Sequence, residues 1–348
     1  MTKIVSIIAT HNARIRCLLD KILKSEEQFN QLSYRDDDEE EVRIKNCAII
    51  RLVINHTGVK LTMEYEGELD PDEKKSSKRK YYITEKQETK ENEVVFNQVF
   101  YNEFKLDTLQ IKSDDLNNNE YVFYIVRHGQ GVHNLAWATH MVLDTDVTPL
   151  GKEQALKAGE QLYTIMNQNG DTLNYTFASD LVRTRQPIIG LYEGINTNDN
   201  KFKPPDSIII LPCSHELKFV EGNCDSKKES FKIGTRENDS KCSIQDKYTE
   251  CKVIKLYNTD IEIDWSQYMD ENYNNGIIRN MDCSNTNMIK IAIEIINKQK
   301  GGKRRRRNKT RKRSKPRSKK SKGGKSGKSG KRSKNKLTGK QKGRTHKK

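Results

Sequence analysis

The chain has 348 residues with 64 Lys and Arg against 48 Asp and Glu, which gives a formal net charge of +16. Residues 301–348 hold 25 of these cations and no acid, so residues 1–300 contain 39 basic and 48 acidic side chains, a balance of −9. The seven cysteines are an odd number without C-x-x-C or zinc-like spacing, which favours a reducing intracellular compartment over a disulfide framework.

No stretch of the chain approaches the roughly 20 apolar residues of a membrane helix. The apolar run Ile4–Ala9 is also too short for the core of a signal peptide. We therefore expect a soluble protein without a membrane partner.

The first elements are a strand and a helix. Residues 3–9 form a β-branched run typical of a buried strand, and apolar residues recur at helical spacing from 13 to 23. Two further strands are predicted at 48–55 and 59–65 around a His-Thr-Gly turn. The following polar segment, 70–92, predicts a flexible insertion.

Strands and helices then alternate along the rest of the chain. The patterns predict strands at 121–126, 176–179 and 208–211. They predict helices at 149–165, 180–192 and 288–296, whereas the polar region 223–260 has no readable pattern. This alternation indicates an α/β fold with a largely parallel central sheet.

The strand 121–126 runs into Arg127-His128-Gly129, within V-R-H-G-Q-G-V-H-N. Ligands bind at the carboxyl ends of strands in open α/β sheets, and a glycine there lets backbone N–H groups approach phosphate. An unprotonated imidazole can attack phosphorus, and a neighbouring arginine lowers its pKa. Arg127 and His128 therefore predict a phosphoryl-transfer site; the other interpretation is a structural histidine at a strand end.

A second cation follows the strand 176–179, in S-D-L-V-R-T-R. Arg183 lies four residues after Ser179, and a guanidinium can bind phosphate through two parallel hydrogen bonds. Arg185 is interpreted as an ordinary surface charge.

These segments resemble the histidine phosphatase superfamily, in which Arg-His-Gly is followed by an Asn six residues after the His, here Asn134. The resemblance implies a phosphoglycerate mutase-like fold, a three-layer sandwich with helices on both sides of the sheet. It implies His128 as the nucleophile and no metal or other cofactor. It also implies that Arg127, Asn134 and Arg183 bind the phosphate.

The family also uses a downstream Glu, sometimes Asp, to protonate the leaving group. Glu216 and Glu221 are both candidates, and Glu216 is preferred because it directly follows the strand 208–211. His215 is a weaker candidate.

Members of the family carry a second histidine late in the chain, yet no histidine lies between positions 216 and 345 here. His11 follows the first strand and precedes a helix, which resembles the late motif with Asn12 in place of Gly. The strand 46–52 resembles the one that follows that motif. The other interpretation is that Thr10 or Asn12 only caps a helix.

The hypothesis is therefore a circularly permuted chain. Residues 1–300 would form a single catalytic domain. Its late half would be 1–69, its bridging segment or insertion 70–118, and its early half 119–300. The prediction is a metal-independent phosphomonoester hydrolase that works through phosphohistidine. Two alternatives are a weak or inactive binding protein on the same fold and a phosphomutase.

The remaining segment, 301–348, predicts a disordered basic tail, because its part from 303 to 348 has one large apolar residue and many Lys and Arg. Such a tail would bind nucleic acid or another polyanion non-specifically, by counterion release. Its Lys-Arg runs suit a nuclear import signal, and its composition resembles the tails of proteins from large DNA viruses. The expected location is an intracellular, reducing compartment, and the basic tail is compatible with the nucleus or a virion. The other interpretation is a solubilising or packaging tail without a specific partner.

Overall fold

The computed structural model describes residues 1–22, 42–69, 80–81, 102–135, 144–214, 216, 253–256, 259–269 and 288–313. Its contacts divide the chain into two compact units, 1–300 and 301–348. The predicted insertion 70–92 lies almost wholly outside the described residues, as does most of the region 223–260. No helix among the described residues is long and apolar enough to span a membrane.

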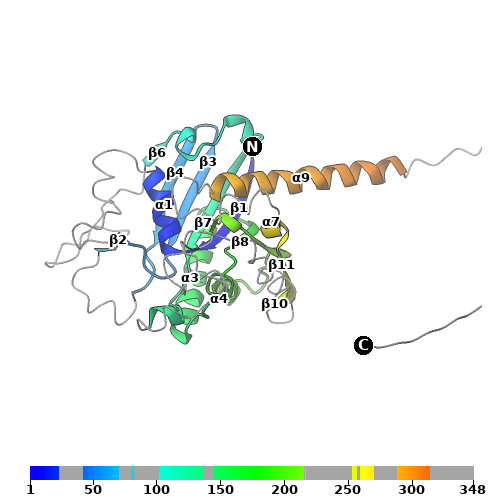
Figure 1. Cartoon of the computed structure of the whole chain (residues 1–348). Coiled ribbons are helices and arrows are strands. Elements are labelled where there is room, and N and C mark those ends of the chain that lie inside the picture. The colour runs from blue at the N-terminus through cyan, green and yellow to red at the C-terminus, as the bar shows by residue number, and fades with distance from the viewer. Residues whose placement is uncertain are drawn as a thin grey trace, which may run out of the picture. The chain divides into compact units, whose positions relative to one another are not determined.

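The first unit is built on a nine-stranded sheet with the order β10-β11-β9-β8-β1-β7-β3-β4-β6 (Figure 1). In chain order its strands are β1 (Thr2–Thr10), β3 (Ile49–Asn55), β4 (Gly58–Tyr65), β6 (Asn102–Phe104), β7 (Asn119–Arg127), β8 (Leu173–Ala178), β9 (Ser207–Ile210), β10 (Val253–Leu256) and β11 (Thr259–Asp264). A separate pair joins β2 (Val42–Arg43) to β5 (Lys80–Tyr81). The five strands from β11 to β7 are parallel, and the strands at both edges are antiparallel.

The N-terminal strand lies in the middle of this sheet, between β7 and β8 and parallel to both. Thr10 is opposite Arg127 in the register with β7, and Ala9 is opposite Ala178 in the register with β8. Three carboxyl strand ends therefore meet at one edge, which is where ligands bind in such sheets.

Successive side chains of a strand point to opposite faces of the sheet, and apolar side chains on both faces are buried. Helices therefore cover both faces. On one face Ile4 and Ile8 of β1 pack with α1 (Asn12–Ile22) and the apolar part of α9 (Met288–Arg313). On the other face Val5 and Ile7 pack with α3 (Pro149–Gln168) and α4 (Val182–Asn198). This arrangement confirms the predicted α/β sandwich with a largely parallel central sheet.

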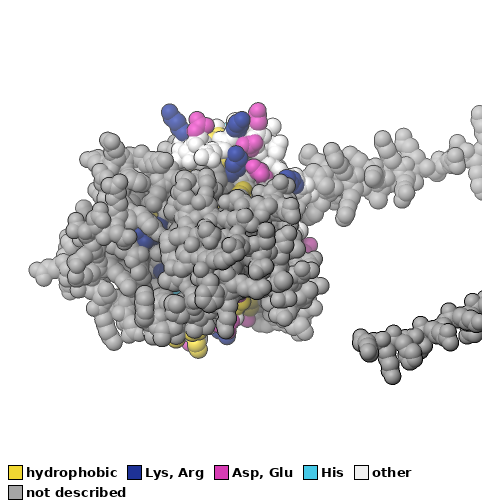
Figure 2. Space-filling model, viewed as in Figure 1, with side chains coloured by type: hydrophobic (Ala, Val, Ile, Leu, Met, Phe, Trp, Pro, Cys, Tyr) yellow, Lys and Arg dark blue, Asp and Glu magenta, His cyan; other side chains and the backbone are white. Residues whose placement is uncertain are grey.

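Short elements connect the main ones. They are the 3-10 helices η2 (Leu106–Leu109), η3 (Ser113–Leu116), η4 (Val132–Asn134) and η6 (Pro212–Ser214), and the one-turn helix α7 (Ser266–Met269). In the view of Figure 2, the described surface at the top carries Lys and Arg side chains next to Asp and Glu. This mixture agrees with the near balance of charge in residues 1–300.

Two features differ from the sequence-based expectations. The strands β10 and β11 pair antiparallel at the edge of the sheet, where the sequence pattern was unreadable. The last helix continues through Gly301-Gly302 to Arg313, so the first part of the predicted disordered tail is helical. Lys and Arg have high helix propensity, and a helix already held by a packed first half can extend at little further cost.

Candidate active site

His128 lies directly after β7 and is almost fully buried, with 2% of its surface exposed. Its Nδ1 is 2.7 Å from the Gly129 carbonyl oxygen, which can only accept, so Nδ1 carries the proton and Nε2 keeps its lone pair. Burial, the adjacent His11 and the guanidinium of Arg183 hold the pKa of this imidazole well below the usual histidine value. His128 is therefore a neutral imidazole with Nε2 available as a nucleophile.

The loop after His128 is packed tightly against the start of α3. A side chain at Gly129 would collide with the backbone of Gly151, and one at Gly151 would collide with the carbonyl of Gln130. The Gln130 N–H donates to Gln154 Oε1 at 2.8 Å, and Thr148, the N-cap of α3, donates through its N–H to the Gln130 carbonyl at 2.9 Å. These contacts fix the loop next to the positive end of a helix, a favourable place for an anion.

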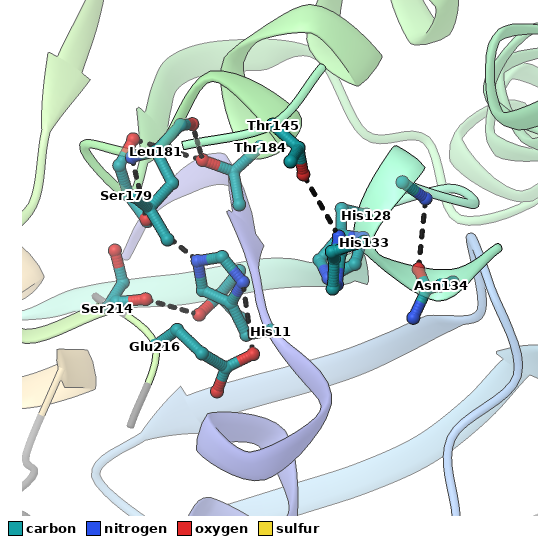
Figure 3. Close-up of polar contacts among 12 residues, drawn as sticks. His11, His128, His133, Asn134, Thr145, Ser179, Leu181, Thr184, Ser214 and Glu216 are labelled. Atoms are coloured by element: carbon teal, nitrogen blue, oxygen red, sulfur yellow. Dashed lines mark hydrogen bonds and ion pairs between the residues drawn. The ribbon is translucent and has the colours of Figure 1, made fainter. Parts of the chain in front are cut away.

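His11 reaches the same point from the neighbouring strand (Figure 3). It follows β1, its side chain is fully buried, and its ring centroid is 5.2 Å from that of His128. Its Nε2 is 2.8 Å from Ser179 Oγ at the end of β8, and its Nδ1 is 3.3 Å from Glu216 Oε2. Both ring nitrogens are therefore engaged, and the imidazole has a fixed orientation.

Glu216 is brought to His11 by the turn that follows β9. The Thr10 hydroxyl donates to the Ser214 carbonyl at 2.8 Å and so ties this turn to the end of β1. Burial would raise the pKa of Glu216, but the charge and hydrogen bond of His11 outweigh it and lower that pKa well below the usual carboxyl range. Glu216 is thus ionised next to His11. The competing candidates Glu221 and His215 lie outside the described residues.

Two arginines line the site. Arg127 Nη1 donates to the carbonyl oxygen of Ile44. The backbone N–H of Ile44 in turn donates to Asn12 Oδ1 at 2.9 Å. Asn12 thus holds the segment that orients Arg127. Arg183, in the first turn of α4, is completely buried, and its charge helps to lower the pKa of His128.

Asn134 ends η4, and its Oδ1 accepts a hydrogen bond from the Gly131 N–H at 3.0 Å (Figure 3). The carbonyl end of its amide therefore shapes the loop, and its NH₂ end is the group that can donate to a phosphate. All six predicted site residues belong to the segments that meet at the carboxyl edge of β1, β7, β8 and β9.

His133 is a further residue of this site that the sequence reasoning did not single out. Its ring centroid is 5.6 Å from that of His128, and its Nδ1 is 3.2 Å from Thr145 Oγ1. Burial and the charge of Arg183 lower its pKa well below the usual value. A Cβ on Gly131 would come within 2.5 Å of this ring, so the glycine makes room for it. The sequence could have indicated His133, because it stands directly before Asn134 in V-R-H-G-Q-G-V-H-N.

The interpretation of Arg185 as a surface charge is wrong. Only 4% of its surface is exposed, and its guanidinium carbon lies 5.3 Å from the ring centroid of Trp265. The pattern of α4 did not reveal this because β11, which carries Trp265 to the helix, was not predicted.

The site also has the donor atoms for a cation. The ligand atoms of His11, His128 and Glu216 all lie within 4.8 Å of one another. However, His11 already contacts Ser179 and Glu216, and the adjacent arginines supply positive charge. The arrangement therefore favours a doubly charged anion such as phosphate.

Comparison with known proteins supports this chemistry for part of the chain. The sequence profile of the histidine phosphatase superfamily (branch 1) matches residues 123–198. A broad-specificity phosphatase of Saccharomyces cerevisiae is 37% identical over 73 residues, which is 21% of this chain and 30% of the yeast protein. The chain thus matches less than a third of that relative's length. No solved structure matches the chain.

Proposed function

We propose that this protein hydrolyses phosphomonoesters through a phosphohistidine on His128. The match of residues 123–198 to the profile of the histidine phosphatase superfamily supports this proposal. The observation that carries the proposal is the pair of buried histidines, His11 and His128, with ring centroids 5.2 Å apart and arginines beside them. We infer that one phosphoryl group lies between the two imidazoles and replaces one of the contacts that His11 makes with Ser179 and Glu216.

In the first step the lone pair of His128 Nε2 attacks phosphorus, and the bond from phosphorus to the ester oxygen breaks. Arg127 and Arg183 bind the non-bridging oxygens, and His11 stabilises the transferring group. In the second step water attacks the phosphohistidine, the P–N bond breaks and inorganic phosphate leaves. The reaction uses no metal in this scheme.

Glu216 gives a proton to the leaving oxygen and takes one from the attacking water. The positive charge of His11 and Arg183 keeps it ionised. A bound phosphate dianion offsets that positive charge and raises the pKa of the carboxyl, which then holds the proton needed for the first step.

The central test is the hydrolysis of p-nitrophenyl phosphate in the presence of EDTA by the wild type, His128→Ala and His11→Ala. We expect His128→Ala to lose at least about 10³-fold in kcat/KM and His11→Ala about 10²-fold or more. His56→Ala is the control, because His56 is exposed at a hairpin turn and contacts only Ser113 among the described residues.

Three outcomes would count against the proposal. Equal activity in all variants would remove both histidines from the chemistry. Activity that EDTA abolishes and zinc restores would replace the metal-free scheme. If the wild type is inactive on several phosphate esters, the chain is a binding protein on a phosphatase fold.

The role of Glu216 is tested with the leaving group. For Glu216→Gln we expect a loss of about 10²-fold on an alkyl phosphate, whose leaving alkoxide needs a proton. The loss on p-nitrophenyl phosphate should be much smaller, since p-nitrophenolate leaves without one. Equal losses on both esters would instead assign Glu216 to orienting His11.

A further inference from the structure

Arg185 is a buried cation that the proposed reaction does not use. Only 4% of its surface is exposed, and its Nε and Nη2 have no hydrogen-bond partner among the residues that the structure describes. Within the described ranges no carboxylate forms an ion pair with it. A guanidinium remains charged at any physiological pH, and an unpaired buried charge is unfavourable unless an anion accompanies it.

The contact with Trp265 accounts for the position of this guanidinium but not for its charge. Trp265 is itself buried and follows β11 directly. A cation over an indole ring is attracted by the ring, yet this compensates only part of the lost hydration. The N–H donors of Arg185 still require an acceptor.

The pair also lies at the edge of the sheet that carries the candidate active site. The strand β11 is parallel to β9, so its end at Trp265 lies at the same edge as the turn that carries Glu216. Arg185 is two residues after Arg183 on α4, so the two side chains leave the helix in different directions, although both start at this edge of the sheet. A ligand that carries an anionic group at each end could engage the phosphate site and Arg185 together.

We propose that Arg185, held over Trp265, is a second anion subsite, which binds a carboxylate or second phosphate of the substrate while the ester phosphate lies at His128. This deepens the proposed hydrolase function and rests on it. A planar guanidinium can bind either group through two parallel hydrogen bonds, which makes Arg185 a specificity-determining residue.

The kinetic test compares substrates that differ by one anionic group. They are fructose 6-phosphate with fructose 1,6-bisphosphate, and glycerol 3-phosphate with 3-phosphoglycerate. For the substrate with two anionic groups, we expect Arg185→Gln to lower kcat/KM by about 10-fold or more, mainly by raising KM. The substrate with one anionic group should be affected less. Arg185→Lys should recover part of the loss, and Lys152→Gln, on the exposed face of α3, is the charge control.

A binding test separates this proposal from the hydrolase function. The chain has two tryptophans and 14 tyrosines, so Trp137→Phe leaves Trp265 as the sole tryptophan, and excitation selective for tryptophan reports on it alone. We expect fructose 1,6-bisphosphate to change its fluorescence saturably, with at least 10-fold weaker affinity when Arg185→Gln is added. This holds even if the wild type hydrolyses nothing.

Two results would overturn the subsite. One is an equal effect of Arg185→Gln on both members of each pair together with a lower unfolding temperature, which would make Arg185 a structural residue. The other is a Trp265 signal that responds equally to the bisphosphate with and without Arg185.

Discussion

His128 and His133 are two buried imidazoles whose pKa values both lie well below the usual 6.5. In the unfolded chain each would have its ordinary pKa, so below pH 6.5 the unfolded state binds more protons than the folded state. The stability that these neutral imidazoles contribute is thus complete above pH 6.5. It is lost as the pH falls towards their folded pKa values.

Replacing His133 should therefore weaken the acid sensitivity of the fold. For His133→Phe we expect the loss of unfolding free energy between pH 7.5 and 5.5 to shrink, by at most about 1.4 kcal/mol for each pH unit below 6.5. Urea unfolding at the two pH values measures the difference. His56→Phe, at an exposed position, is the control for the substitution itself. An unchanged slope in His133→Phe would contradict a neutral His133 in the folded site.

The residues that the sequence identified are those within two compact motifs. Arg127 and His128 follow a readable strand, and Arg183 stands at a fixed spacing from Ser179. The environment of Arg185 could not be predicted, because its neighbour Trp265 is 80 positions away and reaches it through the sheet. Charged residues on helices usually face solvent, and only tertiary structure shows an exception.

At the scale of elements, Asp171 ties three central strands together from the turn between α3 and β8. Its buried carboxylate accepts from Lys3 Nζ at 2.7 Å, from the Tyr124 hydroxyl at 2.6 Å and from Arg51 Nη2 at 3.3 Å. These partners belong to β1, β7 and β3. The carboxylate side chain has no exposed surface, so its loss would leave the Tyr124 hydroxyl and Arg51 Nη2 without this buried acceptor, whereas Lys3 Nζ also donates to the Asn169 carbonyl.

We therefore expect Asp171→Asn to lower the free energy of unfolding by about 2–4 kcal/mol, measured by urea denaturation at pH 7. The matched control is Glu68→Gln, which removes the ion pair with Lys157. The Lys157 side chain is 58% exposed, so this change should stay within about 0.5 kcal/mol. A similarly small effect of Asp171→Asn would show that the three strands do not depend on this carboxylate.

The strands that could be predicted are those with long β-branched runs, such as β1, β7 and the β3–β4 hairpin. The strand β11, second from the edge of the sheet, was missed, although Ile261 and Ile263 are buried and alternate with acidic residues. Such alternation over six residues is a weak signal beside the polar segment that precedes it. The pairing of β11 with β9 depends on contacts between distant parts of the chain, which local patterns do not encode.

At the scale of the whole first unit, the two ends of the chain segment 1–300 meet beside one strand. Thr2 is paired with Asn119 at the start of β7. On α9, Asn297 accepts from the Tyr121 hydroxyl at 2.6 Å and donates to the Asp115 carbonyl at 2.8 Å. Figure 1 accordingly draws the N-terminus next to the orange α9. Chain ends that lie close together are the condition under which a circular permutation leaves core contacts unchanged.

The permutation hypothesis therefore makes a prediction about reconnecting the chain. A protein that starts at Asn102, continues to Lys300, and is joined by a short Gly-Ser linker to residues 1–69 would place His128 before His11 in sequence. Because the sheet order and the contacts of β1 do not depend on where the chain is cut, we expect this protein to fold cooperatively and to hydrolyse p-nitrophenyl phosphate within about 10-fold of the wild type. Circular dichroism with thermal unfolding, and then kcat/KM, measure the two parts. The control joins the same two segments in their natural order, 1–69 followed by 102–300, through an equal linker. If the control folds and the reordered chain does not, the present order of the two halves is required for the fold, and the permutation hypothesis fails.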